Sequence, residues 1–319
     1  MTDIAFRTLG RSDLAVSTIG LGGNNFGRPG TLTHSLEGTT ALIETAIELG
    51  VTLIDTADVY GGQGLSETLL GEALKGRSDR VVIATKFGHP EFDMGILPGV
   101  AKGSREYVRA SIEGSLTRLQ VDHVDLYQMH APDPVTPIRE TIAALNELVV
   151  EGKIRQFGHS NFSAQQIDQA DAAAVALGRA RFESAQDEYS LLERRVEQDV
   201  LPAVKSHDLG FLPYFPLYNG LLTGKFTRTE RPTDTRIMRQ RPHLVENAPW
   251  SVLEAYQAFC VEHGVTMLQA TFAWLLAQPS MTSVIAGATR PEQLEQNARA
   301  ATAWTPTAND VAQISQIFG

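Results

Sequence analysis

Short apolar runs rich in Val, Ile and Leu alternate along the chain with longer segments whose apolar residues recur at helical spacing. Several of the short runs contain hardly a polar residue, which is typical of strands that helices cover on both faces. The pattern predicts strands over Val16–Leu21, Val51–Thr56, Val81–Thr85, Val124–Met129, Ile154–Gly158, Phe182–Gln186, Gly210–Phe215 and Ser283–Ala286. It predicts helices over Thr39–Leu49, Ser66–Lys75, Ser104–Leu119, Ile138–Val150, Ala164–Ala176, Val196–His207 and Pro291–Ala301.

Alternating strands and helices are typical of repeated βα units, which build a parallel sheet. Eight strands with their helices predict an α/β fold in which residues 1–319 form a single domain, a closed (β/α)8 or TIM barrel. No stretch rich in Pro, Gly or Ser separates two halves of the chain. Three segments are additional: Phe6–Ala15 predicts an N-terminal β-hairpin, Leu217–Ala248 a long loop, and Trp250–Gln278 a pair of extra C-terminal helices.

Three predicted helices carry residues that suit a helix start. Ser163 with Gln166, and Thr289 with Glu292, have the spacing of a capping box, in which two side chains satisfy backbone N–H groups of the first turn. Ser66, followed by an acidic residue, suits the start of a third helix. We therefore expect these helices to begin at these residues.

The composition excludes several classes of protein. With 43% hydrophobic and 20% charged residues among its 319, the chain buries a large core and is far from a disordered composition. Its 27 Lys and Arg against 37 Asp and Glu give a net charge of -10, whereas a protein that binds a nucleic-acid backbone usually presents a basic face. We expect no nucleic-acid partner.

Cysteine content and apolar runs bear on location. The one cysteine, Cys260, cannot form a disulfide within the chain, which suits a reducing compartment. The start, Met1–Val16, has no apolar segment of a signal peptide, and the apolar segment Met267–Ala277 is shorter than the ~18 residues that a membrane span needs. We expect a cytoplasmic protein without membrane association.

Four chemically distinctive residues follow the second, third and fourth predicted strands. Asp55 and Tyr60 come after the second strand, Lys86 after the third and His130 after the fourth. In barrels of this type the active site lies where the strands end, so these side chains are expected to meet. The residues Asp55, Tyr60, Lys86 and His130 are therefore our predicted catalytic set.

This combination suits proton transfer to an oxygen. A phenol has an ordinary pKa near 10, and an adjacent ammonium such as that of Lys86 lowers it. Asp55 would keep Lys86 charged, and His130 could hold a carbonyl oxygen by a hydrogen bond. Singly, each residue has a structural explanation as a turn cap, lid or solvated charge, and it is their combination that favours a function. The set has no evident nucleophile, so acyl transfer is not implied.

The later strand ends suit a ligand with an amide and phosphates. Ser160 and Asn161 offer a hydroxyl and an amide, and Gln186 adds a second amide near the aromatic ring of Tyr214. The start of the helix after Arg290 favours a phosphate, because free N–H groups and the positive end of the helix dipole lie there. The glycine-rich segment Gly220–Lys225, Gly287 and Thr289 offer further N–H groups and side-chain donors.

The loop from Lys225 to His243 is basic. It holds Arg228, Arg231, Arg236, Arg239 and Arg241 against Glu230 and Asp234. Such a loop is either a solvated surface or a flap over an anionic cofactor. The sequence leaves both interpretations open.

Several motifs fail on inspection. The run Gly20–Asn25 has its third glycine out of register for a Rossmann fingerprint, and Gly220–Lys225 lacks the spacing of a P-loop. No Tyr-x-x-x-Lys pair is present, which argues against the short-chain reductases. The segment His130–Asp133 is too sparse for a metal site, so we expect no metal.

Along essentially its whole length the sequence resembles the aldo-keto reductase superfamily. The segments that carry the resemblance are Leu53–Ala57 with Tyr60 and Gly61, Ala84–Lys86, Asp125–His130, Gly152–Arg155 with Gly158 and Ser160–Phe162, Gln186 with Tyr189–Leu192, and Gly220–Lys225. The segment Pro213–Leu217 is most similar to bacterial members related to the inositol-operon reductases.

The resemblance implies a barrel that binds NADP(H), with NADPH preferred over NADH, and reduces an aldehyde or ketone. It implies Tyr60 as proton donor, Lys86 and Asp55 as the residues that tune it, and His130 as the residue that orients the carbonyl. Ser160, Asn161 and Gln186 would hold the nicotinamide carboxamide, and Thr289 with Arg290 the 2′-phosphate. The cofactor-binding residues that we expect are Gly23, Asn24, Asp55, Ser160, Asn161, Gln186, Tyr214, Phe215, Pro216, Leu217, Gly220, Lys225, Gly287, Thr289, Arg290, Gln293 and Asn297.

The sequence departs from the family pattern near the expected substrate. His159 stands where a small aliphatic residue is usual, and Asn24 and Asn25 replace a Thr-Met type pair, which predicts a more polar substrate side. We expect the loop Gly88–Gly103 to form one wall of an apolar or aromatic rim. Its apolar members are Phe92, Met94, Ile96 and Leu97, and Phe26 and Tyr218 are expected to form other walls.

Two other functions remain open at this point. One is an NADP(H)-binding regulatory or sensor protein with little turnover, as the potassium-channel β-subunits of this superfamily suggest. The other is a polyol or sugar dehydrogenase, which would use the same site in the oxidative direction. We expect a small-molecule carbonyl substrate and no obligate protein partner.

Overall fold

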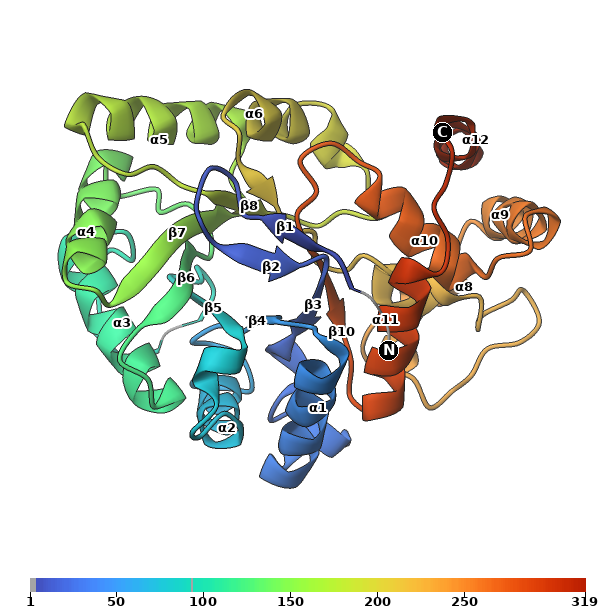
Figure 1. The fold of residues 1–319 in the computed structure, drawn as a ribbon, viewed down its shortest axis with the longest axis horizontal. Coiled ribbons are helices and arrows are strands. Elements are labelled where there is room, and N and C mark those ends of the chain that lie inside the picture. The colour runs from blue at the N-terminus through green and yellow to red at the C-terminus, as the bar shows by residue number, and fades with distance from the viewer. Residues whose placement is uncertain (1–3, 93) are drawn as a thin grey trace.

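Eight parallel strands curl into a barrel at the centre of the molecule, and helices surround it (Figure 1). The computed structural model describes residues 4–92 and 94–319. The strands pair in the order β10-β3-β4-β5-β6-β7-β8-β9. The circle closes beside β9, where the Thr282 N–H donates to the Phe211 carbonyl (2.9 Å) and the Ile285 N–H to the Pro213 carbonyl (3.1 Å). The predicted barrel is confirmed.

All eight predicted strands are present, several with shorter bounds. They are β3 (Ile19–Gly22), β4 (Leu53–Asp55), β5 (Val82–Phe87), β6 (Val124–Met129), β7 (Ile154–Ser160), β8 (Ser184–Gln186), β9 (Gly210–Phe211) and β10 (Val284–Gly287). The predicted β9 is longer than the regular strand, which ends at Phe211; beyond it the chain keeps only isolated pairing, such as the parallel bridge between Glu188 and Tyr214.

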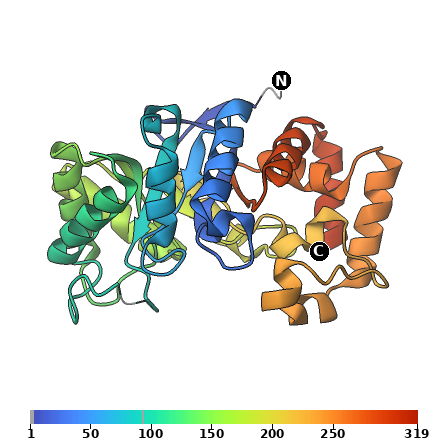
Figure 2. The ribbon, with the colours of Figure 1, turned by 90° about the horizontal axis from the view of Figure 1, so that it is seen from below.

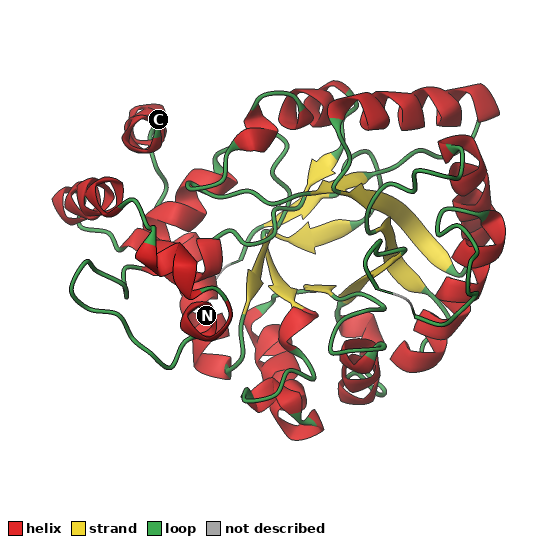
Figure 3. Ribbon diagram, turned by 180° about the vertical axis from the view of Figure 1, so that it is seen from behind, coloured by secondary structure: helices red, strands yellow, loops and turns green. Residues whose placement is uncertain are grey.

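The N-terminal hairpin closes one end of the barrel. Its strands β1 (Phe6–Thr8) and β2 (Ala15–Ser17) pair antiparallel, so the hairpin extends two residues beyond the predicted segment. Buried apolar side chains of the hairpin pack on apolar side chains that point into the barrel. This cluster consists of Leu9, Leu14, Val16, Leu53, Ala84, Leu126, Leu212 and Ile285. Because that end is filled, a ligand site must lie at the opposite end, onto which Figure 3 looks.

Helices cover the outside of the sheet and pack on it through a second, larger apolar cluster. They are α1 (Leu36–Leu49), α2 (Leu65–Ala73), α3 (Arg105–Leu119), α4 (Ile138–Val150), α5 (Ala164–Leu177), α6 (Val200–Ser206) and α11 (Pro291–Thr302). The extra C-terminal helices α9 (Trp250–Glu262), α10 (Met267–Leu276) and α12 (Ala308–Phe318) gather on one side (Figure 2). No helix in the described part of the chain is long and apolar enough to cross a membrane.

The segment predicted as a long loop contains short helices. Within residues 217–248 lie η5 (Tyr218–Thr223), α7 (Arg236–Gln240) and α8 (Pro242–Glu246). Short single-turn 3₁₀ helices also occur as η1 (Gly23–Asn25), η2 (Leu32–His34), η3 (Ser78–Arg80) and η4 (Arg195–Glu197). The long segment is therefore an ordered cover and not a featureless connection.

One predicted helix cap is confirmed and two are wrong, although α11 begins at the predicted Pro291 and α2 begins one residue before the predicted Ser66. Ser163 caps α5 in a capping box with Gln166. Thr289 makes no such box: α11 begins two residues later, and the Thr289 N–H and hydroxyl both donate to Gln293. Ser66 lies inside α2 and is fully buried, and its hydroxyl donates to the Gly23 carbonyl (2.8 Å). The Thr289 hydroxyl thus finds its partner one helical turn along the chain, whereas the Ser66 hydroxyl finds its partner across the fold, which local spacing does not reveal.

Candidate active site

A cavity of about 1610 Å³ opens at the end of the barrel where the strands terminate. This volume exceeds the roughly 300–1,000 Å³ of an ordinary small-molecule pocket, so the cavity has room for a large ligand and a second, small one. Residues that follow β3, β4, β6, β7, β8 and β10 line it, together with the cover formed by residues 214–240.

Lys86 lies at the end of β5 and joins Asp55 and Tyr60. Its ammonium lies 2.6 Å from an Asp55 carboxylate oxygen and 3.5 Å from the Tyr60 hydroxyl, and it also donates to the Thr56 carbonyl (2.9 Å). The Lys86 and Asp55 side chains are only 1% and 5% exposed. Tyr60 is half-buried and lines the cavity. The residues that the sequence placed together therefore meet, with the phenol facing the ligand space.

Burial determines the net pKa of Tyr60. Loss of hydration raises the pKa of the Tyr60 hydroxyl above its ordinary value of 10, and the Lys86 ammonium only partly opposes this rise. The predicted net lowering of that pKa is wrong, because burial raises it more than the Lys86 ammonium lowers it, and the Asp55 carboxylate raises it further. A raised pKa keeps the phenol protonated at neutral pH, and a proton donor must start in that state.

Lys86 stays charged in this site. Burial alone would lower the pKa of its ammonium, but the charge of Asp55 and the hydrogen bonds to Asp55 and Tyr60 oppose that effect, and the pKa is raised above its ordinary 10.5. The ammonium therefore persists in a place from which water is excluded.

His130 lies beside Tyr60 as a neutral imidazole. The two ring centroids are 5.8 Å apart at an interplanar angle of 83°. Burial, with the nearby charge of Lys86, lowers the pKa of His130 well below its ordinary 6.5. A neutral imidazole can donate one N–H hydrogen bond to a carbonyl oxygen without competing with Lys86 for charge.

A row of hydrogen-bonded polar side chains continues from the four residues Asp55, Tyr60, Lys86 and His130, which we call the tetrad. The Gln186 amide donates to Asp55 (2.9 Å), the Ser160 hydroxyl donates to the Gln186 carbonyl (2.7 Å), and the Asn161 amide donates to the Ser160 hydroxyl (2.9 Å). The Tyr214 hydroxyl in turn donates to the Asn161 side-chain oxygen (2.9 Å). Amide and hydroxyl groups beside an aromatic ring suit a planar carboxamide-bearing ring.

The backbone beside these polar side chains has unusual φ angles. Asn161 and Phe215 adopt left-handed conformations with φ of 61° and 51°, which non-glycine residues rarely do. Such conformations cost free energy and concentrate at functional sites. Gly220, with φ of 106°, continues the turn through a region open only to glycine.

Two cations mark the far end of the cavity. Lys225 and Arg290 both line it, and the charge of Arg290 adds to burial in lowering the pKa of Lys225. Arg290 stands immediately before α11. The first turn of a helix has free N–H groups, which can bind an anion. Two nearby like charges beside a helix N-terminus suit a phosphate.

The comparison with known proteins decides the family. A model of the aldo/keto reductase family matches residues 18–318. The chain belongs to the aldo/keto reductase family. Its members are oxidoreductases that use nicotinamide cofactors, so the expected resemblance is confirmed.

Three relatives show the range of this aldo/keto reductase family. The chain is 32% identical to L-glyceraldehyde 3-phosphate reductase of Escherichia coli (strain K12), over 98% of this chain and 91% of that protein. It is 34% identical to NADH-specific methylglyoxal reductase of the same organism, over 92% of each chain. It is also 34% identical to a probable voltage-gated potassium channel subunit beta of Arabidopsis thaliana, over 92% of this chain and 90% of that protein.

The cavity of this aldo/keto reductase suits a nicotinamide dinucleotide. An amide-rich end lies beside the tetrad, and a cationic end lies at Lys225 and Arg290. A Cβ added at Gly287 would come within 3.1 Å of the Asn25 amide, and one at Gly220 within 3.2 Å of Lys225. Because Gly220 and Gly287 have no side chain, the backbone at these two points stays accessible to a ligand in the cavity.

Most of the residues predicted to bind the cofactor line this cavity. They are Asn24, Asp55, Ser160, Asn161, Gln186, Tyr214, Phe215, Pro216, Leu217, Gly220, Lys225, Gly287, Thr289, Arg290, Gln293 and Asn297. Gly23 does not line it, whereas its neighbour Gly22 does. The Gly23 carbonyl instead accepts the Ser66 hydroxyl, which turns this backbone toward α2.

The predicted apolar rim is wrong. In the loop Gly88–Gly103, His89, Pro90 and Glu91 line the cavity, whereas Phe92 is 53% exposed to solvent and does not. Met94, Ile96 and Leu97 do not line it either, and the intervening Asp93 lies outside the described residues. Phe26 is fully buried in the core, and Tyr218 packs on the core from the cover.

His159 also lies away from the cavity. Its ring stacks on Phe162 with a centroid distance of 4.5 Å and meets the edge of Phe182 at 5.1 Å. The His159 side chain is fully buried, and both ring nitrogens lack a hydrogen-bond partner among the described residues. The expectation that His159 makes the substrate side polar is therefore wrong, whereas Asn24 and Asn25 do line the cavity.

Three arginines outside the predicted binding set line the cavity, namely Arg28, Arg236 and Arg239, of which Arg239 pairs with Asp234. Arg28 follows η1, and Arg236 begins α7 in the basic loop; both line the cavity. The run of arginines in the basic loop was a signal for Arg236, and the flap interpretation of that loop agrees with its position. Nothing in the sequence around Arg28 singled it out.

Proposed function

We propose that this protein reduces an aldehyde or ketone to an alcohol with NADPH, and that Tyr60 donates the proton. The observation that supports this function best is the Lys86 ammonium between the Asp55 carboxylate and the Tyr60 hydroxyl, at 2.6 Å and 3.5 Å. A bound nicotinamide would supply the hydride. The relatives named as reductases of glyceraldehyde 3-phosphate and of methylglyoxal act on carbonyl compounds and support the same reaction class.

In this proposal each member of the tetrad has a separate task. Tyr60 donates its proton to the carbonyl oxygen as negative charge develops there, and Lys86 stabilises the phenolate that remains. Asp55 fixes the Lys86 ammonium in place. His130, kept neutral by burial, donates a hydrogen bond that orients the carbonyl oxygen beside the phenol.

The row of polar side chains beyond the tetrad would hold the nicotinamide. Ser160, Asn161 and Gln186 would bind its carboxamide, and Tyr214 would stack on its ring. Leu217, Gly220 and Lys225 would line the pyrophosphate. Gln293 and Asn297 on α11 would face the adenine end.

We also propose that NADPH is preferred over NADH. The support is Arg290, a guanidinium without an ion pair among the described residues, beside Thr289 at the start of α11. A guanidinium offers a fork of donors that suits a phosphate monoester. One relative is named NADH-specific, so the family alone does not fix the preference, and we infer it for this chain from Arg290.

The variant Tyr60→Phe tests the proposed proton donor. It removes the hydroxyl but keeps the ring, so we expect kcat to fall by about 10²–10⁴-fold while NADPH binds with an unchanged Kd. NADPH oxidation with activated aldehydes measures the first quantity, and fluorescence titration measures the second. Full turnover by Tyr60→Phe would reject Tyr60 as the acid.

A second candidate function is an NADP(H)-binding sensor with little turnover. The relative named as a potassium channel subunit beta, 34% identical, favours it. Tight NADPH binding with a negligible rate across a broad panel of carbonyl compounds would support a sensor. Measurable turnover that depends on Tyr60 would support the reductase.

A further inference from the structure

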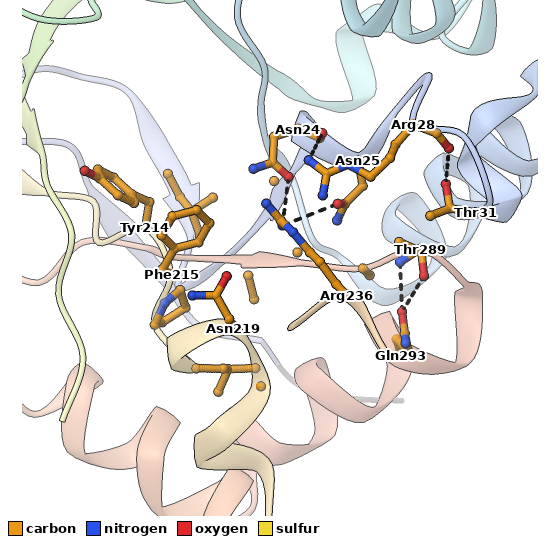
Figure 4. Close-up of a pocket in the computed structure, with 18 of the residues that line it drawn as sticks. Asn24, Asn25, Arg28, Thr31, Tyr214, Phe215, Asn219, Arg236, Thr289 and Gln293 are labelled. Atoms are coloured by element: carbon orange, nitrogen blue, oxygen red, sulfur yellow. Dashed lines mark hydrogen bonds between the residues drawn. The ribbon is translucent and has the colours of Figure 1, made fainter. Parts of the chain in front are cut away.

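Arg28 and Arg236 form a second cationic centre in the cavity, apart from Lys225 and Arg290. Both residues line the cavity and are half-buried. Neither makes an ion pair within the described ranges 4–92 and 94–319. Figure 4 shows the Arg236 side chain reaching toward Asn24 and Asn25, with Arg28 beside these two asparagines.

The partners of these two guanidinium groups are neutral oxygens. Arg236 lies 3.4 Å and 3.5 Å from the side-chain oxygens of Asn24 and Asn25, and it donates to the Gln240 side chain at 3.1 Å. Arg28 donates to the Asn24 carbonyl (3.0 Å) and to the same Gln240 oxygen (3.2 Å). A guanidinium has five N–H donors, and these long hydrogen bonds use only some of them. Both Arg28 and Arg236 therefore have N–H groups left for a further acceptor.

The electrostatics of this arrangement are unfavourable without an anion. Burial, followed by the charges of Arg28 and Arg241, lowers the pKa of Arg236 to about 10. Burial and the charge of Arg239 lower the pKa of Arg28. Like charges gathered in a half-buried cavity repel one another, and an oxyanion would relieve that repulsion and accept the free donors.

The centre lies on the tetrad side of the cavity. An ionised Tyr60 would raise the pKa of Arg236, whereas the charge of Arg290 lowers the pKa of Lys225, so the two centres are within electrostatic range of different groups. Arg236 also contacts Asn24 and Asn25, which follow β3 next to Asp55 in the barrel. The two cationic centres thus lie in different parts of the cavity: Arg28 and Arg236 lie beside Asn24 and Asn25 after β3, whereas Lys225 and Arg290 lie near the start of α11.

We propose that Arg28 and Arg236 bind an anionic group of the carbonyl substrate, so that the preferred substrates are short aldehydes or ketones with a phosphate or carboxylate. This inference rests on the proposed reductase function. The carbonyl lies at Tyr60 and His130, and the oxyanion a few carbons away at the two guanidinium groups. The polar lining of the cavity agrees with a charged substrate.

Matched substrate pairs test the proposal. Glyceraldehyde 3-phosphate is compared with glyceraldehyde, and succinic semialdehyde with butyraldehyde, for the wild type, Arg28→Met and Arg236→Met. We expect the wild type to prefer the anionic member of each pair. Each variant should lose about 10–100-fold in kcat/KM for the anionic member, the effect of losing a charge-assisted hydrogen bond, and at most about twofold for the neutral member.

A charge control and a binding measurement complete the test. Arg228→Met removes a cation of the same loop that pairs with Glu254 outside the cavity, and it should leave the preference unchanged. Calorimetric titration of the NADP⁺-loaded protein with glycerol 3-phosphate requires no turnover. Both cavity variants should weaken that binding about 10-fold or more, whereas Arg228→Met should not.

Several outcomes would overturn the proposal. One is a wild type without preference for the anionic members; another is an equal loss for anionic and neutral members in the variants. A weakened NADPH Kd in Arg28→Met and Arg236→Met with unchanged substrate preference would assign the two arginines to the dinucleotide instead. Failure of the reductase function itself is distinct: the wild type would then oxidise no NADPH with any of the four substrates.

Discussion

Lys86 is a buried charge whose partner determines its effect on stability. With Asp55 at 2.6 Å, both charges are compensated although both side chains are almost fully buried. Removing one member of such a pair leaves an uncompensated buried charge, which typically costs about 3–5 kcal/mol, whereas removing both costs much less. Lys86 therefore contributes to the fold as well as to the proposed chemistry.

The variant Lys86→Met should lower the free energy of unfolding by about 3–5 kcal/mol at pH 7. The double variant, Asp55→Asn with Lys86→Met, should recover most of this loss, because no buried charge remains. Urea denaturation of the wild type and the two variants measures both effects. Equal losses in the single and double variants would show that the pair is not coupled as described.

His159 predicts a pH dependence of stability. Burial lowers its pKa to about 3, whereas an unfolded histidine titrates near 6.5. Above pH 6.5 both states are neutral at this residue, and below it the unfolded state binds a proton that the folded state excludes. His159 therefore destabilises the fold as the pH falls from 6.5 toward 3, by about 1.4 kcal/mol per pH unit.

The variant His159→Leu should remove this acid-dependent loss. Between pH 8 and pH 5.5 the wild type should lose about 1.4 kcal/mol more unfolding free energy than His159→Leu, as measured by urea denaturation at each pH. Comparing the change with pH within each protein cancels the different packing of Leu and His. Identical pH slopes for the two proteins would mean that His159 becomes protonated in the folded state.

At the scale of elements, α11 supplies the site that distinguishes the two dinucleotides. Arg290 precedes the helix, and its side chain lines the cavity beside Lys225. Arg290→Ala should weaken NADPH binding by on the order of 1.5–3 kcal/mol, the value of a charge-assisted contact, and leave NADH nearly unchanged. Fluorescence titration with each cofactor measures the two Kd values.

Arg299 provides a matched control on the same helix. It is an exposed arginine paired with Glu295, and it does not line the cavity. Arg299→Ala should leave both Kd values unchanged. An equal loss of NADPH and NADH affinity in Arg290→Ala would remove the 2′-phosphate role from Arg290.

Strand ends were predictable because the sheet is parallel. Asp55, Lys86 and His130 follow three consecutive strands, and parallel pairing brings such positions to one edge whatever the connecting helices do. The sequence therefore sufficed to group the tetrad. It did not reveal that burial raises the pKa of Tyr60 more than the Lys86 ammonium lowers it.

Loops were less predictable because their paths depend on distant contacts. Phe26 was expected at the rim but turns inward and is fully buried, whereas Phe92 turns outward. Arg28 and Arg236 are more than 200 residues apart in sequence, and they share Gln240 only through the folded cover. No local pattern encodes such a meeting.

The whole molecule divides stability and function between the two ends of one barrel. The hairpin β1–β2 and the apolar cluster around Leu53 and Leu126 fill one end, whereas polar and charged side chains line the other. This arrangement lets a rigid sheet hold the tetrad while residues 214–240 cover the ligand space.

Isotope transfer from the cofactor tests hydride transfer to a carbonyl with Tyr60 as the acid. The most direct measurement uses NADPH that carries deuterium at the transferable position of its nicotinamide, with mass spectrometry of the alcohol formed from an activated aldehyde. For the wild type, we expect deuterium on the former carbonyl carbon of the alcohol. We expect the same product from Tyr60→Phe at a rate about 10²–10⁴-fold lower. An alcohol without deuterium, or equal rates for the two proteins, would rule out hydride transfer with Tyr60 as the acid.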